Sequence, residues 1–313
     1  MGSGDSQTRP KDVQDGAGPK GTSPYATGGG GVTFERKVAV TYLAHLLVGD
    51  AATELGAERR VVSVAFQQAP DHPVDDLVVT AARVDELQPS LILAIAVRRQ
   101  PDFGKSDEPT QKLVRNFVQA VINAPARGPE HRFALVVAGP QSHARQLADL
   151  IDLAQHQMNA AAFFQLVHTR NKFTADVRAR LDHVEGLVKQ GLIDLAVSDL
   201  DTTLVRQRSW DLLSRLTVLM PRLEPPDETD WSTVGNSLIT VSREGDLPSA
   251  SHLRDRLLVL ADEYAPKAAT VDLTMLRRDA QWRRKTCHRP RRCRRERDSH
   301  APREYRKRPD VPR

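Results

Sequence analysis

The sequence predicts an α/β fold with a mixed central sheet and flanking helices, followed by a small helical domain. Two observations lead to this prediction. Residues 32–138 carry apolar patterns in the order helix, strand, strand, strand, helix, strand. Residues 174–279 then show mainly the spacing of helices. Strands that alternate with helical segments are typical of a sheet whose faces are covered by helices.

The first predicted helix starts near Val32. Its apolar residues recur at helical spacing, Thr33 is a suitable N-cap, and Gly49 suits the end of the helix. Residues 61–66 then alternate between apolar and small side chains, as in a strand, and two prolines end the pattern.

A hairpin is predicted next. Residues 76–82 and 91–97 are short runs rich in Val, Ile and Leu, joined by a polar turn, and they suit two antiparallel strands with a buried face. Helical spacing returns over residues 110–122. Residues 132–138 read as a fourth strand, which Gly139-Pro140 ends.

Residues 142–158 predict a further helix, and residues 161–167 a short buried strand. Three apolar stripes at helical spacing follow and predict the helical domain, with a break near Pro225-Pro226. The stripes are Val177, Leu181, Val184, Leu187 and Val188; Leu212, Leu213, Leu216, Val218 and Leu219; and Leu253, Leu257, Leu258, Leu260 and Ala261. Leucine stripes belong to cores far more often than to ligand sites, so we predict no catalysis there.

These patterns divide the chain into four parts. Residues 1–31 are predicted to be a disordered leader, 32–170 the α/β domain, 171–280 the helical domain and 281–313 a disordered basic tail.

The tail holds 14 Lys and Arg against 4 Asp and Glu, a charge of +10. The other 280 residues hold 31 against 36, a charge of −5. The basic balance therefore belongs to the tail and does not indicate that the body binds nucleic acid.

The tail differs so sharply from the body that we consider it as the product of a frameshift or premature end, a hypothesis that resequencing would test.

The sequence contains no apolar run of about 18 residues and no apolar core near its start, so neither a membrane span nor a secretory signal is expected. Both cysteines lie in the tail, which leaves no disulfide framework. A cytoplasmic protein is expected.

Charged residues gather at the ends of the predicted elements. Glu35 lies in the first helix, Asp75 and Asp76 precede the second strand, and Arg98 and Arg99 end the third. Carboxylates beside a cation suit a divalent metal held against a phosphodiester. A purely structural interpretation stands beside this one. Glu35 would then be a solvated first-turn residue, the aspartates a strand start and the arginines a charge pair at the sheet end.

This pattern resembles the PD-(D/E)XK nuclease superfamily, and in particular the double-stranded-DNA endonuclease domain of bacterial antiphage effectors, including STAND-associated ones. The resemblance covers roughly residues 28–170. It rests on GGVTFE (Gly30 to Glu35), on DDL (Asp75 to Leu77) and on the strand LILAIAVRR. It implies a restriction-endonuclease-like αβββαβ core.

The resemblance also implies site roles. Glu35 and Asp76 would hold Mg²⁺, with Asp75 as a further ligand, and Arg98 would contact phosphate. The family's next strand carries Gln or Glu, one residue and then Lys, where this chain has Ala96 and Arg98. Alanine supplies no ligand, and arginine stays protonated, so it can clamp a phosphate but cannot act as a base. Asp75, Gln67 or Gln68 could replace the missing ligand.

Three functions are therefore expected in order. The first is a Mg²⁺-dependent DNA endonuclease module of a bacterial defence protein, with activity that is weak or lost. The second is a non-catalytic DNA-binding, oligomerisation or signalling module with a degenerate nuclease fold. Both imply double-stranded DNA, an NTPase or sensor domain or chain, or a second copy of the chain as partners, and no membrane.

The third is a phosphatase, because SDLDTT (Ser198 to Thr203) resembles the start of haloacid-dehalogenase enzymes, with Asp199 as nucleophile and Asp201 as general acid. A helix N-cap cluster is the favoured interpretation of this segment.

Gly104-Lys105-Ser106 lacks the glycine that a Walker motif requires five residues earlier. Cys287, His288 and Cys293 lack a second pair at zinc-site spacing, which leaves adventitious metal binding.

Overall fold

The structure is a computed structural model. This structure describes residues 29–67, 72–74, 76–86, 88–101, 103, 107–124, 128–169 and 173–280. Almost all of the predicted leader and the whole predicted tail lie outside these ranges, as do Asp75, Gln68, Gly104 to Ser106 and the tail's Cys287, His288 and Cys293. None of the helices in the described part of the chain combines the length and the apolar character needed to cross a membrane.

The predicted order helix, strand, strand, strand, helix, strand is confirmed. The elements are α1 (Gly29–Val48), β1 (Arg59–Phe66), β2 (Leu77–Arg83), β3 (Pro89–Arg98), α2 (Glu108–Asn123) and β4 (Glu130–Val137). The hairpin is confirmed as well, since β2 pairs antiparallel with β3. The first helix begins at Gly29, earlier than predicted, so Thr33 lies inside it and is not its N-cap. Gly49, with φ +81°, follows its last residue as expected.

The rest of the chain is mostly helical. Its elements are α3 (Ser142–Gln155), α4 (Ala160–His168), α5 (Ala175–Asp194), α6 (Thr202–Leu213), β5 (Leu216–Leu219), α7 (Thr229–Ser237), α8 (Leu247–Tyr264), β6 (Thr270–Asp272) and α9 (Leu273–Asp279). Two predictions are wrong. Residues 161–167 belong to helix α4, because a short apolar run fits a buried helix as well as a strand. The stripe over residues 212–219 is the end of α6 followed by strand β5.

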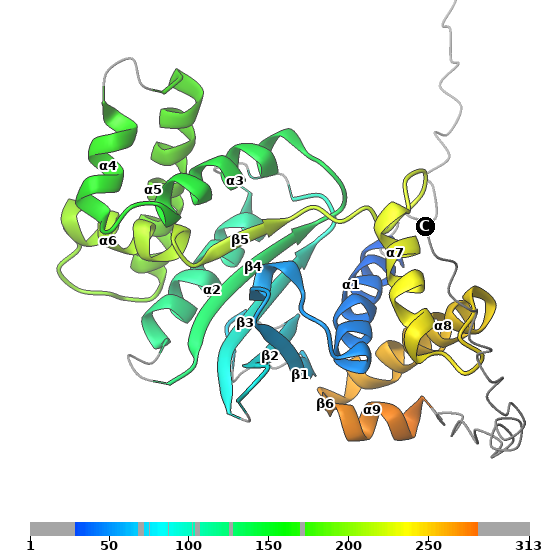
Figure 1. Ribbon diagram of the computed structural model, residues 1–313. Helices are drawn as coiled ribbons and strands as arrows, with labels where there is room; N and C mark the ends of the chain where they lie inside the picture. The colour runs from blue at the N-terminus through cyan, green and yellow to red at the C-terminus, as the bar shows by residue number, and fades with distance from the viewer. Residues whose placement is uncertain are drawn as a thin grey trace, which may run out of the picture.

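Six strands form one mixed sheet in the order β5-β4-β3-β2-β1-β6. Strand β2 runs antiparallel to β1 and to β3, whereas β4 runs parallel to β3 and β5 runs parallel to β4. The C-terminal part of the chain therefore contributes a strand to each edge, with β5 beside β4 and the short β6 antiparallel to β1. Figure 1 shows β5 and β6 at opposite edges of this sheet.

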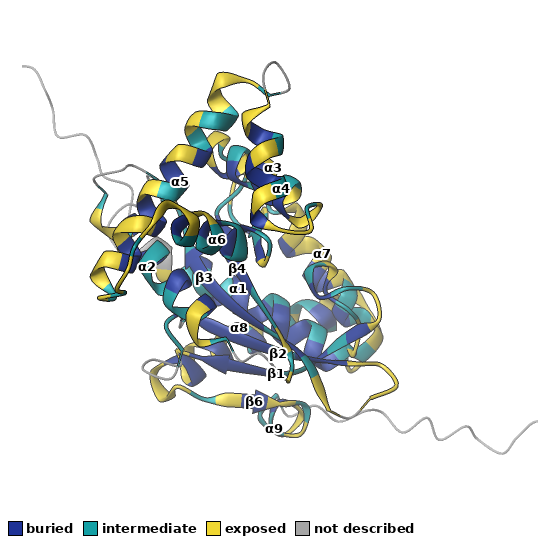
Figure 2. Cartoon of the chain, turned by 90° about the vertical axis from the view of Figure 1, so that its left-hand side faces the viewer, coloured by how far each residue is buried: buried dark blue, intermediate teal, exposed yellow. Residues whose placement is uncertain are grey.

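Two hydrophobic cores lie on opposite faces of the sheet. One is built from α1, α7, α8 and α9, and the other from α2 to α6. In Figure 2 the strands between these two layers are mostly buried. Helix α1 packs against β1 and also against α8, which explains why it is apolar on more than one face. This packing fixes α1 beside the sheet end at which the predicted site residues gather.

Candidate functional site

The sheet topology brings the predicted site residues together. Asp76 immediately precedes β2, and Arg98 is the last residue of β3. Because β2 is antiparallel to both β1 and β3, its start lies beside the ends of those two strands. The backbone amide of Gln67, just after β1, accordingly donates a hydrogen bond to the Asp76 carbonyl at 3.2 Å. Glu35 approaches the same corner from α1.

Asp76 and Arg98 form an ion pair. Arg98 Nη1 lies 2.6 Å from Asp76 Oδ2 and also donates to the Val97 carbonyl at 2.7 Å. The same carboxylate oxygen accepts from the Val97 backbone amide at 2.6 Å. The Asp76 side chain is 18% exposed and that of Arg98 is 37% exposed. The carboxylate is therefore held in place by two donors, while the guanidinium remains accessible to a ligand.

Glu35 is the second carboxylate of the cluster. Its Oε1 accepts a hydrogen bond from Arg36 Nη1 at 3.0 Å, and Arg36 in turn reaches Asp262 on α8. Burial raises the pKa of Glu35, and the charge of Asp76 raises it further. Arg36, Arg98 and a hydrogen bond with Gln67 oppose this rise. Asp76 is thus close enough to Glu35 for its charge to affect the ionisation of Glu35.

Gln67 belongs to the cluster, although the sequence suggested it only as a spare ligand. Its φ is +43°, a left-handed conformation that is uncommon for residues other than glycine. Such strain persists where the surrounding structure enforces it, and it is concentrated at functional sites. The only signal in the sequence is the position of Gln67 directly after a strand, which many residues share.

Mg²⁺ would need several oxygen ligands in near-octahedral geometry. The described residues of the cluster do not fit it. Asp76 Oδ2 is already engaged by a guanidinium and an amide. Position 96, one step beyond the Leu77–Ile95 pair and therefore opposite Asp76, holds a buried alanine with no ligand atom. Arg98 brings a fixed positive charge to the same place. The metal-ligand roles of Glu35, Asp76 and Asp75 stay predictions, and Asp75 lies outside the described residues.

A cavity of about 240 Å³ adjoins the cluster. It lies at the carboxyl ends of the parallel strands β3, β4 and β5, a common place for ligands in α/β sheets. Phe34 and Arg99, the chain neighbours of Glu35 and Arg98, line it. Arg99 Nε pairs with Glu224 Oε2 at 2.8 Å. Arg99, one of the two arginines predicted at the sheet end, therefore contacts the loop after β5. The Arg99–Glu224 pair therefore connects the end of β3 with the loop after β5 that lines the cavity.

The phosphatase interpretation of residues 198–203 is wrong. The apolar run before Ser198 begins in helix α5, which ends at Asp194, and contains no strand, so the fold context of such an enzyme is absent at this place. Asp201 instead caps α6, because its carboxylate accepts from the Leu204 amide at 2.7 Å. The N-cap prediction is confirmed.

The fold and the cluster together define a mixed α/β domain with an acidic and arginine-bearing sheet end. No protein-family model and no curated protein matches the chain. Among solved structures it is similar to the Cap4 SAVED/CARF-domain containing receptor of Acinetobacter baumannii with the cyclic trinucleotide 3'3'3'-cAAA. The identity is 11% and the TM-score 0.43, over 80% of this chain and 44% of that one. For the Cap4 SAVED/CARF-domain containing receptor of Moraxella osloensis, the identity is 12% and the TM-score 0.38, over 79% of this chain and 46% of that receptor.

The chain thus spans less than half of the length of these receptors. At such identities and TM-scores the likeness assigns no function to it.

Proposed function

We propose that this chain is a non-hydrolytic module that binds the phosphodiester backbone of double-stranded DNA through Arg98, on a degenerate nuclease-like fold. The observation that carries the proposal is the ion pair between Arg98 Nη1 and Asp76 Oδ2. It supplies a fixed cation at the position where the resemblance implies a metal ion. The cluster can then attract a phosphate without a metal.

The free edge of the Arg98 side chain supports phosphate binding. Within the described residues, only Nη1 of this guanidinium makes hydrogen bonds, to Asp76 and to Val97. Nε and Nη2 remain as a planar pair of donors, the geometry that binds two phosphate oxygens at once. The pairing with Asp76 orients the side chain in advance, which reduces the entropy lost on binding.

The same residues argue against hydrolysis. Arg98 stays protonated at any relevant pH, so it cannot activate water as a lysine can. Ala96 leaves the position opposite Asp76 without a ligand. Burial and the charge of Asp76 raise the pKa of Glu35. Its hydrogen bonds with Arg36 and Gln67 give it a structural role in this corner.

The proposal includes a biological setting. The resemblance of residues 28–170 to endonuclease domains of antiphage effectors favours a bacterial defence protein, in which this module would act together with a sensor or NTPase domain or chain. Binding of DNA, or closure of the cavity beside Arg99, would be the signal that it passes to that partner.

The test compares DNA binding by the full chain and two arginine variants. Fluorescence anisotropy with a labelled duplex, in EDTA, should give about tenfold weaker binding for Arg98→Ala, because a hydrogen-bonded charged contact contributes about 1.5 kcal/mol. Arg132→Ala is the matched control. Arg132 is also paired with a carboxylate at 2.6 Å and is 35% exposed, but it lies near the start of β4, at the other end of the sheet.

The basic tail is present in all three proteins and contributes equally, so the difference between the two variants isolates the site. Equal affinities of wild type and Arg98→Ala for duplex DNA would refute the proposal. Plasmid nicking in Mg²⁺ or Mn²⁺ that Asp76→Ala abolishes would restore the endonuclease interpretation. Preferential binding of a cyclic trinucleotide, the ligand named for the Acinetobacter receptor, would replace DNA as the ligand.

A further inference from the structure

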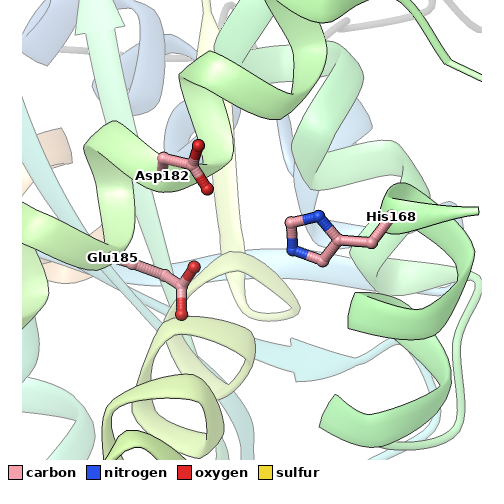
Figure 3. Close-up of side chains that lie close together, drawn as sticks. All are labelled: His168, Asp182 and Glu185. Carbon is pink, nitrogen blue, oxygen red and sulfur yellow. The ribbon is translucent and has the colours of Figure 1, made fainter.

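Three side chains with metal-binding atoms converge where α4 meets α5. His168 is the last residue of α4, and Asp182 and Glu185 lie on α5. One ligand atom of each lies within 4.8 Å of the others. Figure 3 shows that the imidazole and the two carboxylates border one gap between the helices. The three residues come from two elements, so the tertiary packing places them together.

The surrounding structure holds these groups in position. Asp182 and Glu185 are three residues apart on a helix, which puts them on the same face. The ring of Phe164, one turn before His168, stacks on the imidazole with centroids 6.2 Å apart and an angle of 23°. Arg206 Cζ in turn lies 5.1 Å from the centre of the Phe164 ring. The imidazole is therefore oriented by a neighbour that is itself packed.

Two carboxylates, those of Asp182 and Glu185, border the gap. Among the described residues, Glu185 Oε1 pairs with one cation, Arg206 Nε, at 3.4 Å, and the Glu185 side chain is 18% exposed. Burial raises the pKa of Glu185, Asp182 raises it further, and Arg206 and His168 act in the opposite direction. A bound divalent cation would stabilise the charged forms of both carboxylates.

We propose that His168, Asp182 and Glu185 form a binding site for Zn²⁺. One imidazole nitrogen and two carboxylates suit zinc, which takes three protein ligands and a water in open sites, whereas Mg²⁺ and Ca²⁺ prefer oxygen ligands alone. Zinc bonds of about 2.0–2.2 Å place tetrahedral ligands roughly 3.4 Å apart. The three ligand atoms already lie within 4.8 Å of one another, and the side chains of His168 and Asp182 are exposed.

The proposed site is independent of the Arg98 cluster. A bound ion would connect the end of α4 with the middle of α5. It would fix the packing of two helices that cover one face of the sheet. We therefore expect the ion to stabilise the fold, and the site to bind zinc whether or not the chain binds DNA.

The test uses the full chain with ZnCl₂, by isothermal titration and thermal unfolding. The wild type should bind one more Zn²⁺ than His168→Gln, and zinc should raise its unfolding midpoint by about 4 °C more. Asp182→Asn is the second variant and should show the same loss. Both residues are exposed, so the apo variants are expected to fold.

The matched control is His156→Gln. His156 Nδ1 lies 3.5 Å from Asp152 Oδ1 on α3, and this exposed pair has no third ligand among the residues that the structure describes. Ligands in the basic tail are shared by all variants and cancel in the comparison. Loss of one zinc in His168→Gln and Asp182→Asn, with no loss in His156→Gln, supports the site. Identical stoichiometry and midpoints for wild type and His168→Gln show adventitious binding only and overturn the proposal.

Discussion

Arg98 and Asp76 meet at the open end of the β2–β3 hairpin, with Arg98 Nη1 2.6 Å from Asp76 Oδ2. The carboxylate also accepts the Val97 amide at 2.6 Å, so it joins the two strands where their ladder ends. Asp76 therefore has a structural function besides any role toward a ligand. The two functions can be separated by substitution.

Asp76→Ala should lower the free energy of unfolding by about 2 kcal/mol, because the Val97 amide loses its acceptor and Arg98 loses its counter-charge. Asp76→Asn keeps an oxygen for the amide and removes only the charge, so it should cost about half as much. Urea denaturation of the two variants and the wild type measures the difference. Values for both variants within about 0.5 kcal/mol of the wild type would show that the pair contributes little, as for exposed ion pairs.

The second prediction concerns Ala96 and Arg98, the two positions at which this chain departs from the nuclease pattern, and restores the residue types of that pattern. Ala96→Glu combined with Arg98→Lys places a carboxylate opposite Asp76 and replaces a fixed cation with a group that can lose its proton. We expect the double variant to gain nicking of plasmid DNA in Mg²⁺, while the wild type has none.

Controls are needed because Ala96 is buried and a larger side chain costs about 1–3 kcal/mol. Circular dichroism should first establish that the double variant folds. Asp76→Ala on this background should remove the nicking, and Arg98→Lys alone should not produce it. A folded double variant that leaves the plasmid intact would limit the resemblance to the fold.

The third prediction concerns the pH dependence of stability. The pKa of Glu35 is raised above its ordinary value of 4.5 in the folded protein, chiefly by burial. The folded state then binds more protons than the unfolded state between these two pKa values, so stability falls as pH rises through that window. Above the folded pKa the loss is complete and constant.

Glu35→Gln removes this titration. The unfolding midpoint of the variant should therefore rise relative to that of the wild type as pH is raised from about 4.5 to neutral, because the variant lacks this loss of stability. In the variant, Arg36 loses its ion pair with Glu35 but retains its ion pair with Asp262, at 3.0 Å, which limits the loss of stability. Thermal unfolding of both proteins across this pH range provides the test, and parallel curves would mean that Glu35 titrates normally.

The fourth prediction compares two glycines in helix α5. A Cβ on Gly191 would lie 3.1 Å from the Arg115 Cα of α2, whereas a Cβ on Gly186 would have no neighbour within 4 Å. Gly186→Ala should therefore stabilise the protein by about 0.5–1 kcal/mol, because alanine favours a helix. Gly191→Ala should destabilise it, because the α2 backbone must move. Chemical denaturation would contradict this account if both variants gained equally.

The sequence by itself determined the elements whose signals are local. The order of helices and strands from α1 to β4, the β2–β3 hairpin and the Asp201 cap all follow from periodicity and capping chemistry within short segments. The positions of Asp76 and Arg98 at strand ends also indicated one cluster, because antiparallel neighbours bring such ends together.

Only the tertiary structure decided the rest. Strands β5 and β6 are four and three residues long and pair with strands far away in the sequence, so no local pattern marks them. The short apolar run of α4 is compatible with a strand until its packing is known. The pairing of Arg98 with Asp76 and the meeting of His168 with Glu185 depend on distances between separate elements. Residue patterns specify faces and ends, whereas contacts across elements arise from how the two cores pack on the sheet.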